Sequence, residues 1–132
     1  MRWPLRALLT PALLTLVLAA TVLGKAGDGE WLSKVPAKDR GLVNPLANDP
    51  DAPAAGANIF AEHCAQCHGE EAEGKEGKHV RPNLHSERLK QATPGELFWL
   101  LTNGSLKNGM PSWSRLSEAQ RWQVITFLKS LR

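Results

Sequence analysis

The longest apolar run of the chain covers residues 7–24, and it follows two arginines, Arg2 and Arg6. A positively charged segment before a hydrophobic run is the layout of an export signal. The run of eighteen residues is longer than the usual signal core of about 7–15 residues and close to the lower limit of about 17 for crossing a bilayer. Because no clean A-x-A cleavage site follows, the pattern favours an uncleaved transmembrane anchor over a cleaved signal peptide for residues 1–24. Either interpretation places the rest of the chain on the periplasmic side of the membrane.

The next stretch, residues 25–51, has no sustained hydrophobic period and is rich in Gly, Pro, Asp and Asn. This composition is typical of a linker or an extended strap. Six apolar residues interrupt it and indicate that parts of it lie across the surface of a folded domain: Trp31, Leu32, Val35, Leu42, Val43 and Leu46. We therefore predict a linker or strap over residues 25–51 and one folded domain over residues 52–132.

Helix signals dominate the predicted domain. Asp51 is a suitable N-cap and Pro53 suits the first turn, so a helix is predicted from residue 51 to about residue 64. Thr93 and Glu96 have the spacing of a capping box, and they precede a short helix that is apolar on almost every side and stops near residues 103–104. We expect this short helix to be buried.

A last helix is predicted to begin at a second capping box, Ser117 to Gln120, and to run to about Leu131. Its apolar positions recur at intervals of three and four residues and predict one buried face: Leu116, Gln120, Val124, Phe127, Leu128 and Leu131. The predicted fold class is therefore all-α.

One short motif has the most specific chemistry of the chain: Cys64-Ala65-Gln66-Cys67-His68. C-x-x-C-H is the spacing by which c-type haem is attached covalently. The two thiols then form thioethers with the haem, and His68 follows as one axial ligand of the iron. The alternative is a short disulfide or a reducible dithiol. A zinc site needs four ligands, and the chain has no second cysteine pair to supply them.

Met110 is the favoured second iron ligand. An isolated Met usually fills gaps in a core, but this one lies between Gly109 and Pro111 in an otherwise polar loop, whose backbone can aim the thioether inward. His79 or His85 could replace it and give a bis-histidine haem, although loop histidines are expected to be exposed.

Two further residues are expected at the haem. A backbone carbonyl near Pro82 is placed to accept a hydrogen bond from the ring N–H of His68, a contact that fixes the orientation of a ligand histidine. Trp113 follows Met110 in the same loop and is expected to contact the cofactor.

The charge of the chain gives no support to a nucleic-acid partner. Sixteen Lys and Arg against thirteen Asp and Glu give a formal net charge of +3. Two of those cations, Arg2 and Arg6, precede the apolar run, so residues 25–132 carry fourteen Lys and Arg against thirteen Asp and Glu, a net charge of +1. Binding of nucleic acid usually requires a clustered basic face.

Residues 52–132 resemble a class I cytochrome c domain of the small bacterial type. Gly56 and Phe60 match the first helix of that family, where a glycine permits close crossing by the last helix, and Val124 and Phe127 match the partner positions. The resemblance assigns the thioethers to Cys64 and Cys67 and the axial ligands to His68 and Met110. It assigns the carbonyl that orients the histidine to Pro82. It implies a cytochrome c fold in which three to four helices surround one covalently bound haem c, preceded by an N-terminal hydrophobic helix and an extended linker.

Two features depart from the family pattern. Arg81 precedes Pro82 where a glycine is common. The stretch from His68 to Met110 is shorter than in the mitochondrial proteins, so few loops are expected to cover the haem.

Two axial protein ligands would leave no open position for a substrate, so the sequence predicts electron transfer and not catalysis. The expected partners are respiratory or periplasmic redox proteins, with membrane association through residues 7–24 if the segment is retained. One alternative is a haem c subunit of a membrane oxidase or dehydrogenase complex. Another, which applies if Met110 does not bind, is an open-site haem enzyme or sensor.

Overall fold

The computed structural model describes residues 29–77 and 81–131 of the chain. The predicted anchor over residues 1–24 and His79 lie outside the described residues. Every element of this part is helical: η1 (Glu30–Lys34), α1 (Ala37–Arg40), α2 (Ala52–His63), α3 (Ala65–His68), α4 (Glu87–Gln91), α5 (Pro94–Asn103), η2 (Leu106–Asn108) and α6 (Glu118–Ser130). In residues 29–77 and 81–131 no helix combines the length and the apolar character needed to cross a bilayer.

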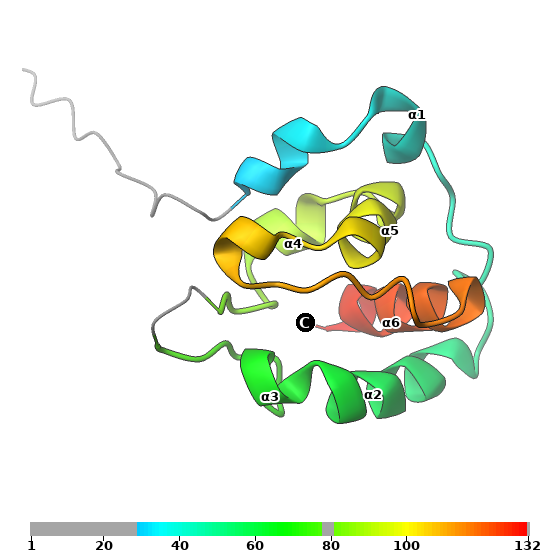
Figure 1. Cartoon of the computed structure of the whole chain (residues 1–132). Helices are drawn as coiled ribbons and strands as arrows, with labels where there is room; N and C mark the ends of the chain where they lie inside the picture. The colour runs from blue at the N-terminus through cyan, green and yellow to red at the C-terminus, as the bar shows by residue number, and fades with distance from the viewer. Residues whose placement is uncertain (1–28, 78–80, 132) are drawn as a thin grey trace, which may run out of the picture.

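The helices pack in the order α2, α6, α5 and α1, with α6 between α2 and α5 (Figure 1). Helices α2 and α6 cross closely at Gly56, where an added Cβ would lie 2.0 Å from the carbonyl oxygen of Gln123 and 2.9 Å from Cβ of Phe127. One turn later the rings of Phe60 and Phe127 pack with their centroids 5.3 Å apart. The predicted crossing of the first and last long helices at Gly56 and Phe60 is therefore present.

Both predicted capping boxes are present. In α5 the side chain of Thr93 accepts a hydrogen bond from the backbone N–H of Glu96, and the carboxylate of Glu96 accepts one from the N–H of Thr93. Ser117 and Gln120 repeat this exchange at the start of α6. These reciprocal bonds satisfy donors that a helix start otherwise leaves unpaired.

The predicted N-cap of α2 is wrong in its detail. The side chain of Asp51 makes no capping hydrogen bond. The carboxylate of Asp49 instead accepts from the N–H of Asp51 at 2.9 Å, and the carbonyl of Asp49 accepts from the N–H of Ala52 at 3.3 Å. The helix therefore begins from a turn organised two residues earlier.

Of the two expectations for residues 25–51, the described part, residues 29–51, agrees with a strap, since it contains η1 and α1 and packs against two helices of the domain. Helix α1 lies on α5 at Gly95, where a Cβ would lie 2.0 Å from the carbonyl oxygen of Asp39. The amide of Asn44 donates to Oγ1 of Thr126 at 2.8 Å and to the carbonyl of Trp122 at 3.3 Å, both on α6.

The packing of Asn44 against α6 changes which face of that helix is buried. The most buried residues of the helix are Trp122, Val124, Ile125 and Thr126, whereas Gln120, Phe127, Leu128 and Leu131 of the predicted face are half-buried. The predicted face is therefore only partly correct, because Asn44 and its neighbours cover a side of α6 that the periodicity marks as polar.

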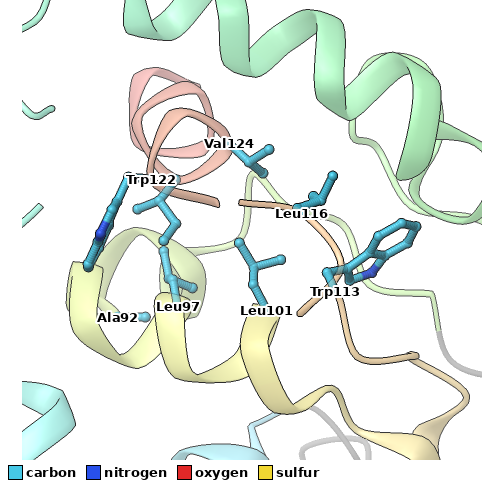
Figure 2. Close-up of a cluster of buried hydrophobic side chains, with 8 residues drawn as sticks. Ala92, Leu97, Leu101, Trp113, Leu116, Trp122 and Val124 are labelled. Atoms are coloured by element: carbon cyan, nitrogen blue, oxygen red, sulfur yellow. The ribbon is translucent and has the colours of Figure 1, made fainter. Parts of the chain in front are cut away.

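The apolar core consists of two clusters. In the larger one, Leu97 and Leu101 of α5 point toward Val124 of α6, with Trp122 at one end and Trp113 at the other (Figure 2). The smaller cluster contains Phe60, Ala65, Ala72 and Leu84. Residues of both clusters line one cavity, which is described next.

Candidate cofactor site

A cavity of about 320 Å³ brings the predicted site residues together. Its wall contains all six of them: Cys64, Cys67, His68, Pro82, Met110 and Trp113. They come from the turn after α2, from the loop before α4 and from the loop between α5 and α6, so segments up to fifty residues apart in the chain meet here. The volume lies in the usual range for a pocket that binds a small molecule or cofactor, about 300–1,000 Å³.

The C-x-x-C-H motif forms a single helical turn that continues from α2. The N–H of Cys64 donates to the carbonyl of Phe60 at 2.8 Å. The N–H groups of Cys67 and His68 both donate to the carbonyl of Cys64, at 3.0 and 2.9 Å. Gly69 then ends the turn with a φ of +87°, which favours glycine. Both sulfurs and the imidazole are thus carried at the cavity wall by the rigid end of a long helix.

Cys64 and Cys67 are not joined in a disulfide, so both sulfurs remain available for thioether bonds. Burial raises the pKa of Cys64 to about 11, and the neighbouring Cys67 acts in the same direction. Before haem is attached, Cys64 is therefore a protonated thiol at neutral pH, unlike the thiolate that makes a redox-active C-x-x-C pair reactive. Across the described ranges, 29–77 and 81–131, no three His, Cys, Asp or Glu side chains gather as a group that could hold a metal ion.

His68 is oriented by the backbone of Pro82. Its Nδ1 lies 3.3 Å from the Pro82 carbonyl oxygen. Burial lowers the pKa of His68, the Pro82 carbonyl opposes this, and the positive charge of Arg81 lowers the pKa further. A neutral imidazole that donates from Nδ1 leaves the Nε2 lone pair available, which is the form in which histidine binds a metal.

The loop after the motif folds back so that Pro82 reaches His68. The N–H of Gly74 donates to the His68 carbonyl at 2.7 Å, and the N–H of Lys75 donates to the Arg81 carbonyl at 3.1 Å. Gly74 has a φ of +85°, and a Cβ there would lie 2.7 Å from the Arg81 carbonyl oxygen. This loop has no apolar periodicity, so the role of Gly74 was not predicted.

The Met110 loop is fixed to the end of α5. Ser105 and Met110 exchange two backbone hydrogen bonds, at 2.8 and 3.1 Å. The N–H of Trp113 donates to the Leu101 carbonyl at 2.8 Å, and the hydroxyl of Ser112 donates to the Thr102 carbonyl at 2.6 Å. The half-buried Met110 side chain consequently lies at the cavity wall and packs against the larger core cluster.

Trp113 joins this loop to the start of the motif. The buried indole stacks at a tilt on the ring of His63, with centroids 5.5 Å apart, and the guanidinium of Arg115 lies 4.4 Å from the indole centroid. His63 directly precedes Cys64 and also lines the cavity. His85 does not line the cavity, and its Nε2 lies 2.6 Å from the carbonyl oxygen of Glu71.

The remaining wall is mostly apolar and includes residues that the sequence did not mark as site residues. Val124 and Leu128 contribute from α6, and Leu97 and Leu101 from α5. Trp31 of η1 also lines the cavity, although it lies in the expected linker; its only signal was an aromatic residue in a polar stretch. A mostly apolar cavity lined by two cysteines, an imidazole and a thioether fits haem c.

Comparison with known proteins agrees with this chemistry. Residues 51–128 match the family model described as cytochrome c oxidase, cbb3-type, subunit III. The cbb3-type cytochrome c oxidase subunit CcoP of Rubrivivax gelatinosus is 40% identical over 67 residues, which are 50% of this chain and 21% of that protein. CcoP of Rhodobacter capsulatus is 39% identical over 87 residues, 58% of this chain and 28% of that protein. The chain thus spans less than a third of the length of these curated relatives.

Solved structures share the fold. Cytochrome cL of Methylophaga aminisulfidivorans superposes with a TM-score of 0.54 at 27% identity, covering 65% of this chain and 59% of that one. Cytochrome cL of Hyphomicrobium denitrificans, at 22% identity, gives a TM-score of 0.53 over 75% and 64% of the two chains. The predicted cytochrome c fold is therefore confirmed for the helical domain. The chain belongs to the family described as cytochrome c oxidase, cbb3-type, subunit III, and is a class I cytochrome c domain with covalently bound haem c.

Proposed function

We propose that this domain transfers electrons through one haem c that Cys64 and Cys67 hold by thioether bonds and that His68 and Met110 bind as axial ligands. The observation that supports the proposal best is the shared cavity. Residues from three separate segments of the chain line it, and one of them, His68, is oriented by a backbone carbonyl for metal binding.

The protein side chains have distinct tasks in this proposal. Bound haem c supplies an iron that takes up and releases one electron. Cys64, at the junction of α2 and α3, and Cys67 of α3 hold the cofactor, and the Pro82 carbonyl holds the imidazole of His68 in one tautomer. Met110 supplies a soft thioether, which favours the reduced state and raises the potential above that of a bis-histidine haem. With both axial positions taken by the protein, the domain carries electrons and has no open position for a substrate.

We propose a membrane-bound respiratory oxidase as the partner. The relatives with 39–40% identity are subunits of cbb3-type oxidases, and this similarity supports the oxidase-subunit alternative over a freely diffusing carrier. The proposed location is the periplasmic side of the cytoplasmic membrane, with residues 7–24 as an anchor if they are retained. Purification from detergent-solubilised membranes tests the partner: copurification with an oxidase supports a fixed subunit, and recovery of the haem protein alone supports a diffusing carrier.

The axial ligation is tested by a pair of substitutions in the Met110 loop. In the oxidised holoprotein, Met110→Ala is expected to abolish the weak absorption band at the long-wavelength end of the visible spectrum that reports a methionine on ferric iron. Leu106→Ala is the control, because Leu106 lies in the same loop but is 80% exposed and does not line the cavity. A high-spin spectrum in the unsubstituted protein, or a band that survives Met110→Ala, would contradict Met110 ligation.

A further inference from the structure

The segment Gly29–Arg40 lies before the residues that the family model matches, yet it forms part of the haem cavity. The match begins at residue 51, whereas Gly29 and Trp31 line the cavity. Trp31 is half-buried and packs against the same core cluster as Met110. This part of the wall is therefore supplied by a segment outside the matched domain.

Arg40 fastens this segment to the domain. Its guanidinium donates to the carboxylate of Glu96 at 2.7 Å, to the carbonyl of Val35 at 3.2 Å and to the carbonyl of Leu32. Glu96 is buried and also accepts from the N–H of Thr93, so its position on α5 is fixed. One side chain thus ties η1, α1 and α5 together, and η1 carries Trp31.

A second contact joins η1 to the Met110 loop. The ammonium of Lys107, in η2, lies 3.2 and 3.4 Å from the two carboxylate oxygens of Glu30. Both side chains are exposed, and surface ion pairs of this kind contribute little on their own. The pair does establish that the turn holding Trp31 lies directly beside the loop holding Met110.

We propose that Trp31 is a positioning residue that closes the cavity on the side of the Met110 loop, excludes water from the haem and keeps Met110 in place. The inference rests on the proposed His68 and Met110 ligation. Removing the indole would open a path for water and for small ligands that compete with the thioether. Water near the iron stabilises the ferric state, so the reduction potential would fall as well.

The test compares Trp31→Ala with Leu32→Ala in the full-length holoprotein. Leu32 is the next residue of η1 and packs against the same core cluster, but it does not line the cavity. The probe is imidazole titrated into the ferric protein and followed by absorption. Trp31→Ala is expected to tighten imidazole binding by about tenfold, which corresponds to about 1.4 kcal/mol, and to lower the reduction potential. Leu32→Ala is expected to leave the imidazole affinity within about twofold of that of the unsubstituted protein and the reduction potential unchanged.

Trp31→Phe provides the rescue. A phenyl ring keeps most of the apolar cover, so this variant is expected to bind imidazole nearly as weakly as the unsubstituted protein. Thermal unfolding of all three variants separates a local opening from a loss of the fold. Equal imidazole affinity and equal potential in Trp31→Ala and Leu32→Ala would overturn the proposal.

Failure of the ligation and failure of the inference give different results. If Met110 does not bind the iron, the unsubstituted protein lacks the methionine band before any change at Trp31. If Met110 binds but Trp31 has no positioning role, the unsubstituted spectrum shows the methionine band and Trp31→Ala leaves it and the imidazole affinity unchanged.

Discussion

Gly56→Ala is expected to weaken the contact between α2 and α6 on which the haem motif rests. The new Cβ would lie 2.0 Å from the carbonyl oxygen of Gln123, 2.6 Å from its carbonyl carbon and 2.9 Å from Cβ of Phe127. The first two atoms belong to the backbone and the third is a Cβ, so a change of side-chain rotamer cannot relieve these contacts. The Cβ and the Gln123 carbonyl oxygen must move apart by about 1.4 Å to restore ordinary van der Waals contact.

The size of the effect follows from three contributions. Overpacking of a close-packed site costs about 1–3 kcal/mol. Separation of the helices weakens the Phe60–Phe127 ring pair, whose centroids are 5.3 Å apart and which contributes about 0.5–1.5 kcal/mol. Alanine regains about 1 kcal/mol of helix propensity relative to glycine. The expected net loss in the free energy of unfolding is about 1–3 kcal/mol.

Chemical denaturation of the holoprotein, followed by helical circular dichroism and by haem absorption, measures this loss. Gly41→Ala is the matched control, because a Cβ at Gly41 would meet nothing within 4 Å and the residue has a φ of −82°. The control is expected to be neutral or stabilising by up to about 1 kcal/mol. If Gly56→Ala proves as stable as Gly41→Ala, the close crossing of α2 and α6 is not what holds the motif.

Two further substitutions probe the strap and the cavity charge. Gly95→Ala is expected to push α1 off α5, because its Cβ would lie 2.0 Å from the Asp39 carbonyl oxygen. Since α1 can shift outward, the loss in the free energy of unfolding should be about 1 kcal/mol, smaller than for Gly56→Ala. Thermal unfolding measures it. Arg81→Gln is expected to lower the reduction potential by up to about 60 mV, because a cation at the cavity wall disfavours the more positive ferric state; redox titration measures it, and an unchanged or raised potential would refute the reasoning.

The sequence predicted the parts of the fold that depend on local rules. Both capping boxes occupy the expected positions, and the helix after Thr93 ends at Asn103 as expected. These features could be predicted because a cap involves residues three positions apart and needs no knowledge of the rest of the chain. The close crossing at Gly56 was expected through the family resemblance, since spacing alone does not say which glycine faces another helix.

Contacts between distant segments could not be predicted in this way. Glu96 carries the signal of a capping residue, and its second role, the ion pair with Arg40 fifty-six residues earlier, has no local signature. Asn44 is equally unmarked, yet its hydrogen bonds to Thr126 and Trp122 decide which side of α6 is covered. The prediction for residues 25–51 rested on their amino-acid composition, and composition does not show which helices a segment packs against.

The cavity brings together the residues proposed to bind haem, which the sequence indicated, and Trp31, which it did not mark as a site residue. Phe60 and Leu84 of the smaller cluster and Leu97 and Val124 of the larger one all line it, so a bound cofactor joins two cores that are each small. A chain of about a hundred folded residues buries limited apolar surface by itself, which makes this junction important to stability. Residues that bind the cofactor therefore have chemistry that a motif can reveal. A residue such as Trp31 needs only to be large, apolar and correctly held, and the side chain that holds it, Arg40, contacts the domain and not the haem cavity.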